Sequence, residues 1–177
     1  METPPQPRFY FDPGAPASWL VAERILHDLP ELAEWVPADL GVDPAPDWTG
    51  LAARAEQLGL LPARPPAAWP PDTGLALRAL TYSRSLGKTV SFGQALLRQV
   101  YAGGRDLGDP DTVAIAGAAA EIHPRALLAA VETAGMARAL AEATAAARAA
   151  GVGRGPAVAW PDGRVLVGAD RIAGGRA

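Results

Sequence analysis

The chain has 177 residues, enough for one domain with a real core, and 49% of them are hydrophobic. Its net charge of −3 comes without a basic cluster, so nucleic acid is not an expected partner. The absence of cysteine excludes disulfides, thiolate metal sites and Cys-X-X-Cys redox chemistry by this chain. No apolar run approaches the roughly 20 residues that span a bilayer, and the first residues lack the features of a signal peptide. We therefore expect a cytoplasmic protein that has no membrane partner.

The N-terminal part of the chain has the pattern of a β-α-β unit. Residues 1–7 form a Pro-rich lead-in that we expect to be flexible. An aromatic strand is predicted over 8–12, closed by a Pro-Gly turn. Apolar residues then recur at helical spacing from Pro16 to Leu29. A second, weaker strand is predicted over 34–40.

The middle of the chain has a helical pattern throughout. A Pro-rich connector over 62–71 interrupts it, and Asp72 or Thr73 is a candidate cap for the helix that follows. The alanine-rich last helix is the most strongly helix-prone. Helices are expected over 51–60, from the cap to Leu86, and over 91–102, 111–121, 124–133 and 136–150.

The alternation of a β-strand returns after Gly151. Two short apolar stretches, 157–160 and 164–167, flank Pro161-Asp162-Gly163, which is a turn sequence. The order β-α-β, helical block and β-hairpin predicts one small sheet built from both ends of the chain, with the helical block inserted between them.

Five segments of the sequence carry a family resemblance. They read Phe-Tyr-Phe-Asp with Pro and Ser-Trp-Leu (9–20), Trp-Pro-Pro-Asp-Thr and the helix start after it (69–79), Gly-Gly-Arg-Asp-Leu-Gly-Asp-Pro (103–110), Gly-Val-Gly-Arg-Gly-Pro (151–156) and Val-Gly-Ala-Asp-Arg-Ile (167–172). In this order they resemble the 2-hydroxychromene-2-carboxylate isomerases and kappa-class glutathione transferases, which are DsbA-family proteins with a thioredoxin fold.

The resemblance implies an α/β, thioredoxin-like fold with a large all-helical insertion between the β-α-β half and the C-terminal hairpin. On this basis the thioredoxin-like domain comprises residues 8–47 and 151–177, and the inserted helical domain comprises 48–150. Asp12, which ends the first strand and matches the family's aspartate, is interpreted as structural.

The most informative difference from the family lies at the start of the first helix. Ala15 stands where the family's isomerases and transferases have the serine that holds a glutathione thiolate, and Ala15-Pro16-Ala17-Ser18 replaces the Cys-Pro-x-Cys of oxidoreductases. Pro16 is expected to line the ligand pocket. Alanine has no hydroxyl to donate to a thiolate, which leaves the helix dipole and the free N–H groups near Ala17 and Ser18. Ser18, one turn further on, is either a displaced hydroxyl donor or a helix residue bonded to the preceding turn.

The remaining site residues come from the same resemblance. Pro156 is expected to be a cis-proline facing the helix start, and the backbone beside it, at Gly155, would pair with the peptide-like chain of glutathione. Asp170 and Arg171 match a pair that reaches the γ-glutamyl end of glutathione, although capping and charge pairing are the alternative. Trp69 is a candidate for the pocket mouth.

Other signals for a site are weak. His27 and His123 have no partners at metal-ligand spacing, so no metal is expected. Gly87-Lys88-Thr89 has the residues that end a phosphate-binding loop but lacks the glycine and the strand that should precede it.

We therefore expect a protein that binds glutathione or a related small thiol, or an aromatic carboxylate, and is weakly active or inactive. If it is active, an isomerase or glutathione transferase is expected. The alternatives are a catalytically silent module that binds a ligand or a protein, and an isomerase that uses Ser18. A homodimer is suggested by family analogy alone.

Overall fold

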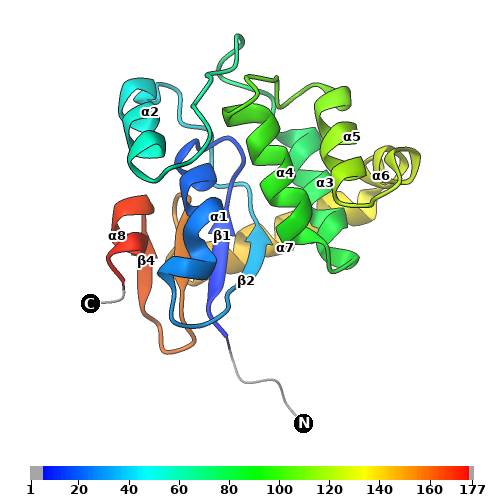
Figure 1. The fold of residues 1–177 in the computed structure, drawn as a ribbon. Coiled ribbons are helices and arrows are strands. Elements are labelled where there is room, and N and C mark those ends of the chain that lie inside the picture. The colour runs from blue at the N-terminus through cyan, green and yellow to red at the C-terminus, as the bar shows by residue number, and fades with distance from the viewer. Residues whose placement is uncertain (1–5, 176–177) are drawn as a thin grey trace.

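The computed structural model describes residues 6–175, and its centre is a four-stranded sheet (Figure 1). The strands are β1 (Arg8–Phe11), β2 (Glu34–Pro37), β3 (Ala157–Ala159) and β4 (Val165–Val167), in the order β2-β1-β3-β4. β1 pairs in parallel with β2, whereas β3 is antiparallel to both β1 and β4. The two ends of the chain thus build one sheet, as the sequence pattern predicts.

The helices surround this sheet unevenly. α1 and α8 lie on one face, α7 lies on the other, and α3 to α6 group beyond the β2 edge (Figure 1). None of the helices within residues 6–175 has the length and apolar character needed to cross a membrane. The helices are α1 (Ala17–Asp28), α2 (Trp48–Gln57), α3 (Gly74–Ser85), α4 (Thr89–Tyr101), α5 (Pro110–Ala119), α6 (Pro124–Val131), α7 (Ala134–Ala149) and α8 (Ala169–Ala173).

The alternation within β1 explains why both faces of the sheet are covered. Phe9 and Phe11 point to one face, where each ring meets Trp35 edge-on at centroid distances of 5.1 and 5.6 Å. Tyr10, between them, points to the other face and joins a smaller cluster with Val36 and residues of α7. One core runs without interruption from the β1 aromatics into the helical block. The domain boundaries at residues 47 and 151 stay a prediction.

Most element boundaries lie close to their expected positions, and side chains account for the shifts. β2 ends at Pro37, three residues early, because the backbone beyond it bonds to the Asp12 side chain through the Leu40 N–H. α2 begins at Trp48 because Asp47 caps it, its carboxylate accepting the Gly50 N–H at 2.8 Å.

The flexible lead-in expected over residues 1–7 is only partly tested. Residues 1–5 lie outside the described residues, as do 176–177 at the other end. Pro7 is buried, and its carbonyl accepts the Glu34 N–H at 2.8 Å. The chain is therefore fixed from residue 7 onward rather than from residue 8.

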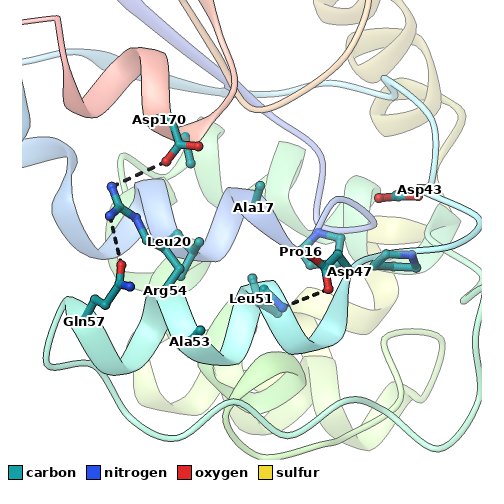
Figure 2. A pocket seen from close by; sticks show the side chains of 13 residues that line it. Pro16, Ala17, Leu20, Asp43, Asp47, Leu51, Ala53, Arg54, Gln57 and Asp170 are labelled. Carbon is teal, nitrogen blue, oxygen red and sulfur yellow. Dashed lines mark hydrogen bonds and ion pairs between the residues drawn. The ribbon is translucent and has the colours of Figure 1, made fainter.

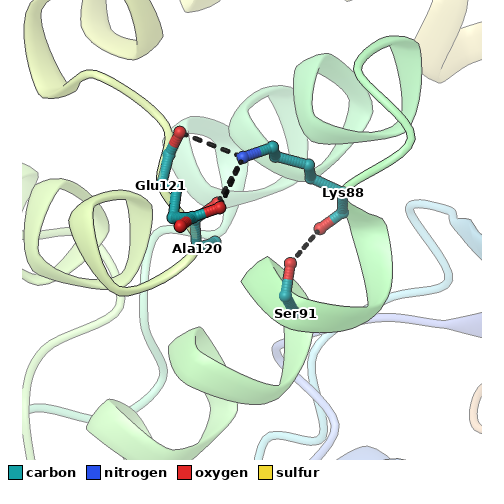
Figure 3. A network of polar contacts seen from close by, with 4 residues as sticks. All are labelled: Lys88, Ser91, Ala120 and Glu121. Carbon is teal, nitrogen blue, oxygen red and sulfur yellow. Dashed lines mark hydrogen bonds and ion pairs between the residues drawn. The ribbon is translucent and has the colours of Figure 1, made fainter.

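Lys88, from the rejected phosphate-loop motif, has a structural contact instead (Figure 3). Its Nζ donates to the carbonyls of Ala120 and Glu121 at 3.0 and 3.1 Å, just beyond the end of α5. The Glu121 carboxylate lies 3.5 Å from the same nitrogen. A cation at a helix C-terminus is favourable because unpaired carbonyls gather there.

Candidate functional site

The junction between β1 and α1 is a tight turn that leaves one amide unused. The Ala15 N–H donates to the Asp12 carbonyl at 3.1 Å, and the Ser18 N–H donates to the Ala15 carbonyl at 2.8 Å. The expectation of a free N–H at Ser18 is therefore wrong, because this N–H is hydrogen-bonded to the Ala15 carbonyl within the turn. Among residues 6–175, no hydrogen bond uses the Ala17 N–H, which is the donor that the helix start offers to a ligand.

Asp12 holds this junction against the segment that follows β2. Its carboxylate is fully buried and accepts three amide N–H groups: Gly14 at 2.8 Å, Leu40 at 2.8 Å and Gly41 at 3.2 Å. Burial raises the pKa of the Asp12 carboxyl to about 6, although these three N–H groups oppose the shift. The contacts agree with the structural role that the sequence suggested.

The peptide bond between Gly155 and Pro156 is cis, as the resemblance implies. The Pro156 carbonyl accepts the Gly168 N–H at 2.8 Å, so the proline is fixed to the strand beyond the hairpin. The N–H and carbonyl of Gly155 take part in no hydrogen bond among the described residues. A Cβ at residue 155 would lie 3.1 Å from Leu40 Cδ1 and 3.4 Å from the Asp12 nitrogen, so a larger residue there would require a small shift of the Leu40 side chain.

A cavity of about 430 Å³, which we call the cis-proline cavity, separates the helix start from this proline. Its lining includes the helix start, Ala15 to Ala17, together with Gly155 and Pro156. Asp43 and Arg154 are the charged residues of its lining. The structure thus brings Ala15, Pro16, Gly155 and Pro156 together around one space of a size typical for small-molecule sites.

Ser18 lies outside this cavity. Its side chain is fully buried, and its hydroxyl donates to the Asp12 carbonyl at 2.8 Å. This contact matches the alternative in which the hydroxyl bonds to the preceding turn, and the role of displaced donor has no support in the geometry.

Trp69 also lines neither this cavity nor the second one described below. Its indole Nε1 donates to the Asp43 carbonyl at 2.8 Å, and its ring meets Trp48 edge-on at 5.0 Å. Trp69 is thus placed to position the segment that carries Asp43 rather than to form the pocket mouth.

A second cavity, of about 570 Å³, lies on the other side of the α1 start, between α1, α2 and α8 (Figure 2). We call it the α2 cavity. Leu20 and Leu51 supply apolar walls, and Arg54 projects across to Asp170 with an ion pair of 3.4 Å. Arg171 is exposed and lines neither cavity, so only Asp170 of the expected Asp170–Arg171 pair lies at a cavity.

Tyr101, which the sequence reasoning missed, lies beneath the helix start. Its fully buried hydroxyl donates to the Pro13 carbonyl at 2.5 Å. Burial, reinforced by the charges of Asp12 and Asp43, raises the pKa of this phenol well above its usual value, so it stays a neutral donor. Position 101 follows Leu97 by four residues on the apolar face of α4, and that spacing indicates only a core residue.

Arg54 and Arg154 are further lining residues that the sequence reasoning missed. Gly41-Val42-Asp43, which begins the segment that matches a shortened glutathione-binding loop of the family, lines the cis-proline cavity. The segment is visible in the sequence as a Gly-containing connection after the second strand. Neither arginine stands out, because an exposed arginine on a helix or loop is ordinary.

Comparisons with known proteins identify the fold. No family model matches the chain, and no curated protein matches its sequence. Among solved structures, the chain is similar to a 2-hydroxychromene-2-carboxylate isomerase with a TM-score of 0.81 and 19% identity over 96% of this chain and 94% of that one. It is also similar to a "probable DsbA oxidoreductase" of Streptomyces coelicolor, with a TM-score of 0.75 and 17% identity over 97% and 88%. For the oxidoreductase DsbA of Xylella fastidiosa the TM-score is 0.59, with 15% identity over 98% and 83%.

The sheet order, the cis-proline and these likenesses define a DsbA-like thioredoxin fold. Among the solved structures with this fold, the backbone is similar to that of the 2-hydroxychromene-2-carboxylate isomerase over nearly its full length. The sequence contains no cysteine, so it has no counterpart of a Cys-X-X-Cys pair.

Proposed function

We propose that this protein binds glutathione or a related small, peptide-like thiol in the cis-proline cavity and activates the thiol only weakly. One observation carries the proposal: Gly155, whose N–H and carbonyl make no hydrogen bond within residues 6–175, and Ala17, whose N–H makes none either, line the same cavity of about 430 Å³. A backbone edge with a free donor and a free acceptor pairs with a peptide-like chain in the way that a strand does.

The helix start supports binding of an anionic group but not its strong activation. A thiolate near the Ala17 N–H gains about 0.3–1 kcal/mol from the helix dipole at an exposed site. A hydroxyl donor would add about 1.5–3 kcal/mol, as is typical for a hydrogen bond to a charged group. Ala15 cannot make that bond, so thiol chemistry of the isomerase or transferase kind should be weak. We infer a binding protein with residual activity at most.

Calorimetric titration with reduced glutathione tests the proposal, with S-methylglutathione as the ligand that lacks a free thiol. We expect both ligands to bind, because the backbone contacts need no thiol. Ala17→Leu should abolish binding by filling the space beside Pro16, whereas Ala118→Leu, on the exposed surface of α5, should leave it unchanged. No heat at millimolar glutathione, or equal binding by the two variants, would refute the proposal.

Ala15→Ser then tests the second half of the proposal. Restoring a hydroxyl at the helix start should lower the pKa of the bound thiol by about 1–2 units, from the free energy of one charge-assisted hydrogen bond. The ultraviolet absorbance of the thiolate, titrated against pH, measures this directly. If the serine variant and the parent give the same thiol pKa, the thiol does not lie at residue 15.

A second candidate function is a catalytically silent module that binds a protein partner. Nothing in the described contacts favours it over a small ligand. Cytoplasmic localisation and a homodimer likewise stay predictions.

A further inference from the structure

We propose that one inorganic phosphate ion binds between Arg24 and Arg54, in a cavity of about 130 Å³ that residues of α1, α2 and α8 line. We call it the Arg24 cavity. It shares no lining residue with the cis-proline cavity, and its charged residues, Arg24, Asp28 and Arg54, come from the C-terminal halves of α1 and α2. The proposal does not require that glutathione binds.

The size of the Arg24 cavity favours a small ion. At about 30 Å³ for each water molecule, its 130 Å³ corresponds to roughly four waters. Clefts that hold organic ligands usually measure about 300–1,000 Å³. A single tetrahedral ion therefore fits this space, whereas an ion attached to an organic body does not.

Arg24 supplies a buried donor that nothing uses. Its terminal nitrogen Nη2 donates to the Asp28 carboxylate at 3.1 Å, as an i,i+4 ion pair on α1. Its Nε is buried without a hydrogen-bond partner, and it is the one such side-chain atom within the part of the chain that the structure describes. A buried, charged donor without an acceptor is costly, so such an atom marks a place for a bound water or ion.

Arg54 brings a second guanidinium to the same cavity. Its terminal nitrogens make only long contacts, 3.4 Å to Asp170 and 3.3 Å to Gln57 (Figure 2). Arg98, in contrast, holds the Glu23 carboxylate with two contacts of 2.6 Å. Two cations that line a small space repel each other, and an anion with several oxygens accepts hydrogen bonds from both.

Asp28 decides which oxyanion the cavity prefers. Its carboxylate lines the cavity, and only 12% of its side chain is exposed. A carboxylate has about four acceptor positions and no donor, so beside the donors that it already holds it favours a ligand with an O–H group. At neutral pH inorganic phosphate keeps at least one P–OH group, whereas sulfate has none. Two cationic donors and one anionic acceptor therefore select phosphate over sulfate.

Titration with potassium phosphate at neutral pH tests the proposal, followed by amide chemical shifts and calorimetry. Potassium chloride holds the ionic strength constant, so that general screening does not change. We expect shifts concentrated at Arg24, Arg54 and Leu58, and a dissociation constant that is roughly millimolar. Sulfate should bind about tenfold more weakly, because it offers the Asp28 carboxylate no donor. Glycerol 3-phosphate, which carries the same group on an organic body, should also bind more weakly.

Two substitutions test the donor and the acceptor separately. Arg24→Lys keeps the positive charge but removes the Nε–H, so it should weaken phosphate binding about tenfold. Its control, Arg125→Lys at an exposed position on α6, should have no effect. Asp28→Asn supplies a side chain that can also donate, so this variant should bind sulfate and phosphate equally. Asp111→Asn, at an exposed position on α5, should keep the preference for phosphate.

The comparison of phosphate with sulfate needs no variant, so it decides the matter even if a substitution alters the fold. Equal affinity for the two ions would show that Asp28 does not recognise a P–OH group. The absence of a saturable shift at high millimolar phosphate would show that water alone fills the cavity. Unchanged affinity in Arg24→Lys would assign binding to charge rather than to the buried Nε, and tighter binding of glycerol 3-phosphate would assign the cavity to phosphate esters. Each of these results would overturn the proposal. Glutathione binding is measured separately, so either proposal can fail alone.

Discussion

Replacing Asp12 with asparagine should change how the stability of the protein depends on pH. The Asp12 carboxyl is fully buried, and its pKa rises from an ordinary 3.8 to about 6 in the folded state. The folded protein therefore binds the proton more tightly than the unfolded chain does. Its stability falls as pH rises between these two values, and the charged form carries the full penalty above about pH 6. Two pKa units correspond to about 3 kcal/mol at neutral pH.

Most of the free-energy penalty of the buried, charged Asp12 carboxylate should disappear when the pH is lowered from neutral to about 4. The free energy of unfolding of the wild type, minus that of Asp12→Asn, should rise by about 2 kcal/mol on acidification over this window, because asparagine does not titrate. The comparison is between pH values, so the contact that asparagine loses with the Leu40 or Gly41 N–H cancels.

Urea unfolding at a series of pH values, with tryptophan fluorescence as the probe, measures both chains. Asp111→Asn, at an exposed position on α5, is the matched control and should follow the wild type. A difference that stays flat with pH, or one that grows toward neutral pH, would refute the reasoning. The first result would mean that the three N–H contacts fully compensate for burial, and the second that they exceed it.

Three further substitutions test the contacts around the site. Tyr101→Phe should cost about 1–3 kcal/mol of unfolding free energy, because it leaves the Pro13 carbonyl without its buried donor; a loss below about 0.5 kcal/mol in urea unfolding would contradict this. Lys88→Met should lower the free energy of unfolding by about 1 kcal/mol, because the carbonyls of Ala120 and Glu121 at the end of α5 lose their donor. This loss should not diminish at high salt if the direct hydrogen bonds dominate. Trp69→Phe keeps a ring against Trp48 but loses the bond to the Asp43 carbonyl, so it should speed amide hydrogen exchange over 41–47; unchanged exchange would show that this segment does not depend on Trp69.

The sequence predicted the fold well because its signals are local. Alternation in 8–12, the Pro-Gly turn after it and the Pro-Asp-Gly turn at 161–163 each act within a few residues. The cis-proline was expected from the resemblance of 151–156 and is present at Gly155–Pro156. Boundaries shifted by up to three residues where a side chain such as Asp47 supplied a cap.

The site was predicted less completely because its contacts join distant parts of the chain. Arg54 meets Asp170, and Tyr101 reaches Pro13, through packing that no local pattern encodes. Trp69 shows the same limit, since the sequence suggested a place at the pocket mouth, whereas its ring meets Trp48 and its indole N–H bonds to the Asp43 carbonyl.

Binding and chemistry at the helix start depend on different parts of the structure. The donors and the acceptor at Ala17 and Gly155 belong to the backbone, and they are held by Asp12, the cis-proline and Tyr101 rather than by the residue at position 15. Loss of a hydroxyl there leaves those groups in place. A cavity with intact backbone groups and an inert Ala15 should therefore keep a ligand of the same shape while it loses the power to activate it. Affinity for S-methylglutathione should thus be the same in the parent and in Ala15→Ser, and only the pKa of a free thiol should differ between them.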